Sequence, residues 1–223
     1  AAACAAAGVV VGVASLTGIG LRMSELIITL AGGNLFPALI LTALGSIVLG
    51  MGLPTTAAYV VLAALGAPAL VELGVPLLAA HLFIFYFGAL SNVTPPVSLA
   101  AFAAAGIADS PPMKTAFTGM GLAAAGFLVP FAFVYGPGLL LIGSPVTIAI
   151  SILTGLAGVI ALAGSVVGWF RRPLGWLDRA VLAAAAVALV FPGLWTGGAG
   201  LVALLWAGRR SASPAEAALA TAD

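Results

Sequence analysis

The chain has 223 residues, of which 63% are hydrophobic and only 6% are charged. This composition excludes an ordinary soluble domain, in which about 25% of residues are charged. The formal net charge of +1 excludes a nucleic-acid-binding face, because phosphate binding needs a dense basic patch. The single cysteine, Cys4, and the single histidine exclude an intrachain disulfide framework, a four-ligand zinc site and the HExxH metalloproteases.

Long segments without Asp, Glu, Lys or Arg follow one another along the chain. They are residues 1–21, 26–71, 73–108, 115–170 and 180–208. Each reaches the roughly 20 residues that a helix needs to cross the hydrocarbon core of a bilayer. The sequence therefore predicts an all-α polytopic membrane protein embedded in the lipid bilayer.

The first uncharged segment predicts one membrane span over residues 3–21. It is rich in Ala and Gly, the small residues that let helices pack closely in lipid. Arg22 and Glu25 mark the expected end of the span. A short amphipathic stretch over 23–31 then leads to a loop signal at residues 32–34.

The second uncharged segment is interrupted near its middle. Two apolar arms, 35–49 and 57–71, flank the sequence GMGLPTT at residues 50–56, and each arm is too short to cross a bilayer comfortably. Non-helical backbone at membrane depth is tolerated only where it lines a cavity or is buried in protein. We therefore expect a re-entrant helical hairpin over 35–70 with its tip at 50–56. The alternative is one long kinked helix.

The third segment repeats this pattern over residues 76–107, with a break at SNVTPP, residues 91–96. Its paired prolines remove two backbone donors and bias the preceding residues away from helix. The combined length of the two arms suits one crossing by a discontinuous helix. Two neighbouring interrupted segments, each with a polar break, point to a transporter's binding site near the bilayer midplane.

The remaining segments predict ordinary spans. Residues 115–135 and 146–170 each form one expected span, and Trp169 sits where an interface anchor is expected. The segment 180–208 is interrupted at Pro192, so it forms either one tilted helix or two short ones, and a helical hairpin is favoured. A disordered tail is expected over 211–223.

The basic residues predict the orientation of these spans. Lys114 and the cluster Arg171, Arg172 and Arg179 flank the spans 115–135 and 146–170 on the same side. The positive-inside rule makes that side cytoplasmic. The hairpin then enters from the outer face, and Arg22 is a single exception.

The two breaks supply the candidate ligand-binding residues. Gly50 and Gly52 permit a tight tip, and Pro54, Pro95 and Pro96 keep both helices broken. The side-chain oxygens come from Thr55, Thr56, Ser91, Asn92, Thr94 and Ser98. Such oxygens, together with free helix ends, suit a sodium ion, and we expect its ligands to be Thr56, Ser91, Asn92 and Thr94. The alternative is a packing kink in which the hydroxyls bond back to the preceding turn and Asn92 caps a helix.

Other polar residues give no second site. His81 has no acidic neighbour, which favours a packing or interhelical hydrogen-bond role over proton transfer. Leu53 stands where an intramembrane aspartyl protease would carry its acid, and Ser46 with His81 forms no recognisable serine-protease motif. We therefore expect no enzyme activity and no cofactor other than a coupling ion. A non-transporting membrane scaffold that packs through its Gly and Ala faces stays open as an alternative.

Three segments resemble the large permease component of TRAP transporters (DctM-like). They read GMGLPTTAAYVVLAALGAPAL, HLFIFYFGALSNVTPPVSLAAFAAAGIA and GFLVPFAFVYGPGLLL, and the resemblance covers roughly residues 1–142. More narrowly, they are similar to the fused permeases that work with TAXI-type binding proteins. The resemblance implies an elevator-type transporter of the bacterial inner membrane, in which sodium entry drives uptake of small organic acids delivered by a periplasmic substrate-binding protein.

The resemblance also implies a division of the chain. Residues 1–142 would be the second-repeat half of the transporter, with one re-entrant helical hairpin and one discontinuous helix holding the substrate and sodium sites. These would slide against a scaffold containing 3–21 and 115–135. Residues 143–210 would be a C-terminal transmembrane extension with no site. The first repeat and the small four-helix component would be partners, and we expect the chain to be the C-terminal part of a longer fused permease.

Overall fold

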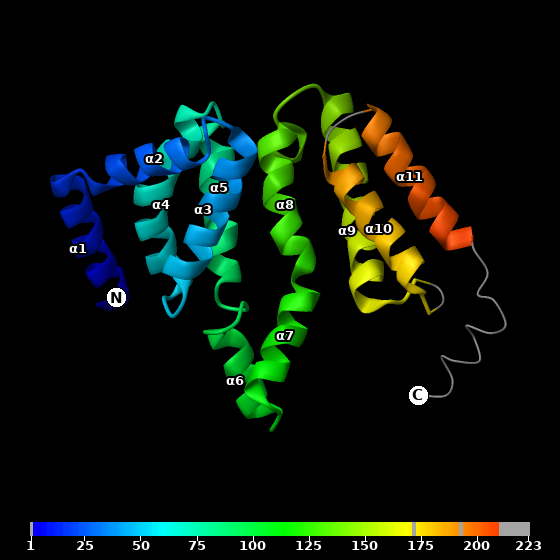
Figure 1. Cartoon of the computed structure of the whole chain (residues 1–223), viewed down its shortest axis with the longest axis horizontal. Helices are drawn as coiled ribbons and strands as arrows, with labels where there is room; N and C mark the ends of the chain where they lie inside the picture. Colours follow the sequence, from blue (N-terminus) through cyan, green and yellow to red (C-terminus); the bar gives the residue numbers. More distant parts are fainter. Residues whose placement is uncertain (1, 171–172, 192–193, 210–223) are drawn as a thin grey trace. The chain divides into compact units, whose positions relative to one another are not determined.

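The computed structural model describes residues 2–170, 173–191 and 194–209. All the regular elements assigned within these residues are helices (Figure 1). The expected all-α polytopic membrane fold is confirmed, since three helical segments in the described residues are long and apolar enough to cross a membrane. The chain divides into two compact units, Ala1–Pro130 and Phe131–Asp223, which are described separately. The expected tail over 211–223 lies outside the described residues.

The first expected span ends earlier than the sequence predicts. Helix α1 (Ala2–Thr17) is followed by α2 (Ile19–Leu30), and the two are bent by 76°. The bend falls at Gly18, whose φ of +68° is a left-handed conformation that favours glycine. The first helix therefore ends at Thr17 rather than at residue 21, and residues 19–21 belong to α2, which continues through Arg22 and Glu25.

Helix α2 lies against the next helices through one face. Ser24 and Ile27 on that face are buried, whereas Arg22 and Glu25 are exposed. A Cβ built on Gly20 would lie only 2.9 Å from the Ala64 carbonyl oxygen of α4 (Thr55–Glu72). The α2–α4 approach therefore depends on a residue without a side chain.

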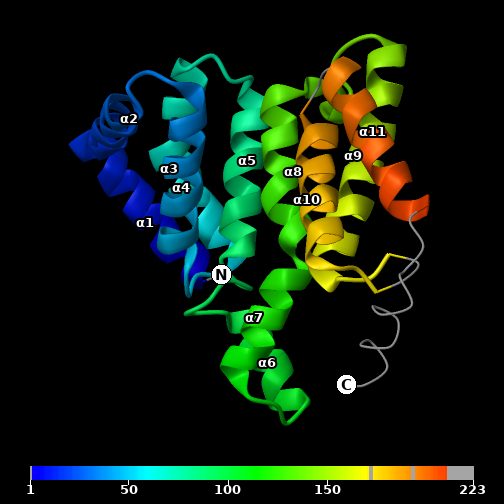
Figure 2. The ribbon, with the colours of Figure 1, turned by 45° about the vertical axis from the view of Figure 1, so that its right-hand side comes forward.

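Helices α3 (Leu35–Gly50) and α4 fold back on one another, which excludes the alternative of one long kinked helix. Helix α5 (Leu77–Leu90) packs on both, and Figure 2 shows the three side by side. Small residues make this packing close, since a Cβ on Gly66 would lie 3.4 Å from both Thr42 and Ile84. The largest fully buried apolar side chains of this three-helix core are Leu39, Leu70, Phe83 and Ile84.

His81 joins α5 to α4 through a hydrogen bond, as expected for an interhelical role. The Tyr59 hydroxyl lies 2.9 Å from His81 Nδ1, and both side chains are half-buried. Phe85 packs edge-on against Tyr59 with ring centroids 5.8 Å apart. The hydrogen bond and the ring contact together fix the register of the hairpin on α5.

We expect the Tyr59–His81 bond to contribute about 1 kcal/mol to stability. A double-mutant cycle with Tyr59→Phe and His81→Ala, measured by denaturant unfolding in detergent, should give a coupling energy of that size. A control cycle of Tyr59→Phe with Thr118→Ala should give no coupling, because the described hydrogen bond of Thr118 is to Lys114 O within its own helix. Zero coupling in the first cycle would contradict the assignment.

The first unit ends with a broken helix and a span. Helix α6 (Leu99–Ile107) packs against α7 (Pro112–Leu122), which continues after a kink at Ala123 into α8 (Ala124–Tyr135). Together α7 and α8 form a 24-residue candidate span, where the sequence predicts one over 115–135.

The second unit contains the short 3₁₀ helix η1 (Pro137–Leu140) and the helices α9 (Pro145–Val167), α10 (Trp176–Val190) and α11 (Leu194–Arg209). Helix α9 is a candidate span, and α10 and α11 pack on each other and on α9. The segment 180–208 is therefore two helices rather than one, as the break at Pro192 favours.

Arg179 of α10 closes the end of α9. Its guanidinium donates to the carbonyl oxygens of Ser165 and Val166, at 2.8 and 2.9 Å, while the Ser165 hydroxyl donates to the Arg179 carbonyl at 2.7 Å. These bonds satisfy carbonyls that the last turn of a helix leaves without partners. Arg171 and Arg172, the rest of the expected basic cluster, lie outside the described residues.

Candidate ion- and substrate-binding site

The hairpin tip and the helix break are in contact. A Cβ built on Gly50 would lie 2.8 Å from the Ser91 hydroxyl oxygen and 3.4 Å from the Gly88 carbonyl oxygen. A Cβ on Gly52 would lie 3.9 Å from Val97 at the far end of the break. The two interruptions, far apart in the sequence, therefore meet through the glycines of the tip.

The break faces the middle of the α7–α8 span. A Cβ on Gly126 would lie 3.1 Å from Leu90, the last residue of α5, and a Cβ on Gly119 would lie 4.0 Å from Ala101 in α6. At 1.5 Å per residue the span is about 36 Å long, and Gly119 and Gly126 bracket its centre. If this span crosses the bilayer, we expect the break, and the tip beside it, to lie near the midplane.

Three polar side chains of the break bond back to the last turn of α5. The Ser91 hydroxyl donates to Gly88 O at 2.7 Å, the Asn92 amide to Ala89 O at 3.4 Å and the Thr94 hydroxyl to Leu90 O at 2.7 Å. These are the bonds that a packing kink would make. A hydroxyl that donates its only proton to a carbonyl still has its lone pairs, and it presents oxygen without hydrogen to any further neighbour. The bonds therefore also suit an oxygen ligand of a cation.

Ser98 is different, because its hydroxyl has no hydrogen-bond partner among the described residues. It is fully buried at the start of α6, where its side chain makes no capping bond, and its Oγ lacks a hydrogen bond. A buried polar atom left unpaired costs about 1–3 kcal/mol. The backbone N–H of Ala100 bonds the Asn92 carbonyl at 3.1 Å, which closes the break across the cis Pro95–Pro96 peptide. The break thus holds an unsatisfied oxygen beside its bonded ones.

The hairpin tip contributes mainly backbone groups, rather than side chains, to the candidate binding site. Gly52 has a φ of +78°, and the Leu53 N–H bonds Gly50 O at 3.2 Å to close the turn. Pro54 then begins α4 without a side-chain cap. The first N–H groups of α4 have no partner within the helix, and they carry the positive end of its dipole.

The structure joins Gly50 and Gly52 to the second break, whereas Thr55 and Thr56 lie on the first turn of α4. Thr56 is exposed and Thr55 is half-buried. No described contact brings either threonine to the residues 91–98. Burial and the missing hydrogen bond single out Ser98 within the predicted set, a distinction that the sequence pattern does not make.

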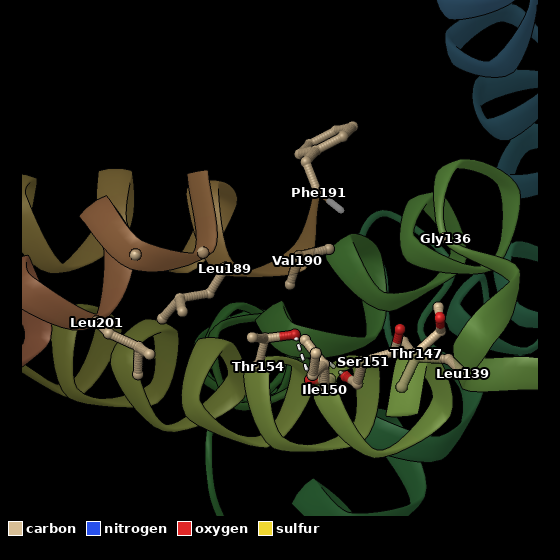
Figure 3. A pocket seen from close by; sticks show the side chains of 12 residues that line it. Gly136, Leu139, Thr147, Ile150, Ser151, Thr154, Leu189, Val190, Phe191 and Leu201 are labelled. Atoms are coloured by element: carbon tan, nitrogen blue, oxygen red, sulfur yellow. Dashed lines mark hydrogen bonds between the residues drawn. The ribbon is translucent and has the colours of Figure 1, made fainter. Parts of the chain in front are cut away.

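A separate cavity of about 540 Å³ lies within the second unit, where the sequence suggests no site (Figure 3). Thr147, Ser151 and Thr154 line it from α9, and Leu189 and Val190 line it from α10. The three hydroxyl residues recur at intervals of four and three, so they share one face of α9. That spacing is visible in the sequence and is the signal that could have found the cavity.

The fold and these contacts are those of a membrane transporter. Paired interrupted helices that meet near mid-membrane are the arrangement in which membrane transporters bind their ions and substrates. The family model of the tripartite ATP-independent periplasmic transporters, DctM component, matches residues 1–148. The chain belongs to this family, so it is a multi-pass permease component of a TRAP transporter, and the resemblance in the sequence is confirmed. No curated protein and no solved structure matches the chain significantly.

Proposed function

We propose that the chain carries one ion- and substrate-binding half of a sodium-coupled TRAP permease that imports small organic acids. One observation carries the proposal: the glycine tip touches a helix break that faces the middle of the α7–α8 span. This break contains the Ser98 hydroxyl, which has no partner in the described part of the chain. A break that served only as a hinge would gain nothing from a buried, unsatisfied oxygen.

The break residues would hold the sodium ion through oxygen atoms alone. Residues 26–71 and 73–108 contain no Asp, Glu, Lys or Arg, so no permanently charged side chain competes with the ion or pairs with it. The Ser98 hydroxyl oxygen would coordinate the ion. The side-chain oxygens of Ser91, Asn92 and Thr94 would coordinate it too, and their hydrogen bonds to the last turn of α5 already hold these side chains in place. Sodium, a hard cation, suits such oxygen ligands.

The substrate carboxylate would be bound by helix N-termini. The starts of α4 and α6 follow directly on the tip and the break, and neither has a side-chain cap. Backbone N–H groups at such ends bind anions without a basic residue. This would explain how an organic acid is recognised in segments that contain no arginine.

The transported part would comprise α3–α6 and would slide as an elevator against a scaffold containing α1, α7 and α8. The first repeat and the small four-helix component would complete the permease. A periplasmic binding protein, of the TAXI type in the fused permeases that the sequence resembles, would deliver the solute at the bacterial inner membrane. Residues 143–210 would be a transmembrane extension outside this site.

We expect sodium chloride to raise the melting temperature of the purified protein relative to choline chloride, since a ligand that binds only the folded state stabilises it. The double variant Thr56→Ala with Asn92→Ala should lose most of that rise. A matched double variant, Thr118→Ala with Asn34→Ala, removes the same groups from residues outside the tip and the break and should keep the rise. An unchanged sodium response in the first variant would contradict the assigned ligands.

The competing function is a membrane scaffold that anchors other subunits without transporting anything. A scaffold has no reason to bring two helix breaks together, whereas a binding site requires it. Its signature would be a wild-type melting temperature that is the same in sodium and in choline.

A further inference from the structure

The cavity of the second unit is large enough to hold a small molecule. Its volume of about 540 Å³ lies within the range of about 300–1,000 Å³ that is typical of small-molecule sites. Its walls combine apolar side chains, such as Leu139 and Leu189, with a few hydroxyl groups of α9 (Figure 3). None of the described lining residues is charged, so the walls suit an uncharged and mainly apolar ligand.

Thr154 can only accept a hydrogen bond from such a ligand. Its hydroxyl donates to the carbonyl oxygen of Ile150, which lies 2.9 Å away in the preceding turn of α9. The proton of Thr154 is therefore in use, whereas the lone pairs of its oxygen remain available. A ligand that bonds Thr154 must carry a hydrogen-bond donor.

The Ser151 hydroxyl still has its proton to donate. It makes no hydrogen bond with the described residues, and its oxygen is not sealed from the surroundings as those of Thr42 and Ser98 are. Gly138 of η1 packs directly against this hydroxyl, since a Cβ at that position would overlap it. The Ser151 hydroxyl is thus held at the wall of the cavity, where it can donate to a ligand.

The spacing of Ser151 and Thr154 selects one chemical group. Residues three apart on a helix have Cβ atoms about 5–6 Å apart. One ligand oxygen between the two side chains could lie about 2.8 Å from each hydroxyl, which is the usual length of an O–H···O bond. An alcohol satisfies both, because its oxygen accepts from Ser151 and its proton is donated to Thr154. An ether, ester or ketone oxygen only accepts, so it would leave Thr154 without a bond.

We propose that this cavity binds an uncharged alkyl alcohol, with its hydroxyl between Ser151 and Thr154 and its alkyl chain against the apolar walls. Ile150 and Leu201 also line the cavity and are 47% and 42% exposed, so the ligand can enter from the bilayer. The site lies in residues 143–210, where the sequence predicts none, and it shares no residue with the proposed ion site.

Two isomers test the assignment, because 1-octanol and 1-methoxyheptane have the same formula but only the alcohol carries a donor. The purified protein would be photolabelled with octanol that bears a diazirine in its alkyl chain, while each isomer competes at rising concentration. Octanol should protect peptides of α9, α10 and α11 at about three- to tenfold lower concentration than the ether. That factor corresponds to one additional hydrogen bond.

Variants of the cavity should separate the two hydroxyl roles. Thr154→Val removes the acceptor and nearly preserves the volume, so octanol should lose its advantage over the ether. Ser151→Ala should weaken protection by both isomers to a similar extent. Gly198→Leu should abolish the protected labelling, because a Cβ on Gly198 meets no atom within 4 Å and the longer side chain can fill the cavity.

Thr118→Val is the matched control, because Thr118 makes the same bond to the preceding turn in α7 as Thr154 makes in α9. It should keep the preference for octanol. Labelling that octanol does not protect, equal protection by the two isomers, or a preference that survives Thr154→Val would each overturn the proposal. Thr154→Val keeps the test decisive if Gly198→Leu fails to fold.

Discussion

Ser98→Ala is expected to abolish most of the sodium-dependent rise in melting temperature without destabilising the sodium-free protein. The hydroxyl is buried and makes no bond within the described residues, so its removal leaves no other group unpaired. Without sodium the variant should be as stable as the wild type or more stable, by on the order of 1 kcal/mol. Thermal unfolding in a sodium titration, with choline chloride keeping ionic strength constant, measures both effects.

Thr42→Val is the control for this experiment. Among the described residues Thr42 carries the other buried hydroxyl without a partner, but it lies on α3 about two turns before Gly50 rather than at the break. The variant should also tolerate the loss of its hydroxyl, and its sodium response should stay that of the wild type. A sodium response that survives in Ser98→Ala would remove Ser98 from the ion site.

Gly50→Ala should weaken sodium binding by about ten- to a hundredfold. The added methyl group would lie 2.8 Å from Ser91 Oγ and 3.2 Å from Ser91 Cβ, so the tip and the break must separate. Forcing extra volume into a packed contact costs about 1–3 kcal/mol, and each 1.4 kcal/mol is tenfold in affinity. Sodium titrations monitored by melting temperature would give the two dissociation constants.

Gly45→Ala provides the comparison on the same helix. A Cβ at this position meets no atom within 4 Å, so the substitution tests the loss of a helical glycine without a clash. Its sodium affinity should stay within about twofold of the wild type, whereas helix propensity should raise its stability slightly. Equal effects of the two substitutions would show that the tip contact plays no part in binding the ion.

The two helix breaks could be predicted from the sequence because their signals are local. Glycine and proline interrupt a helix wherever they cluster, and the uncharged arms on either side restrict both breaks to the membrane. The hairpin α3–α4 and the pair α5–α6 therefore appear close to their expected places. The sequence also predicts that the two breaks meet, because transporters build their binding sites from such pairs of interrupted helices.

The bend at Gly18 could not be predicted in the same way. Gly18 is one of several glycines in an Ala- and Gly-rich segment, and Gly8 and Gly12 lie inside α1 without bending it. What distinguishes the bend is the packing that follows it, where Gly20 approaches the α4 backbone. A contact with a helix more than 30 residues away decides which glycine takes the left-handed conformation, and no local pattern reports it.

The burial of individual hydroxyl groups could not be predicted from the sequence either. Ser98 and Thr42 read like other hydroxyl residues in apolar segments, where bonding to the preceding turn is the ordinary outcome. Whether such a bond forms depends on the local rotamer and on the neighbouring helices, which only the three-dimensional packing specifies. For this reason the sequence places Thr56 among the ion ligands, although the structure leaves Thr56 exposed and buries Ser98 with no partner in the residues that it describes.

The Arg179 cap has a consequence for how the protein is made. During insertion the carbonyls of Ser165 and Val166 are not yet at the end of a docked helix, so Arg179 is a free positive charge, which in the predicted orientation would retain its loop in the cytoplasm. Once α9 and α10 pack, the same guanidinium is bound to those carbonyls. In that orientation one side chain would first act as a topology signal for the nascent chain, and afterwards it holds α9 and α10 together through these hydrogen bonds.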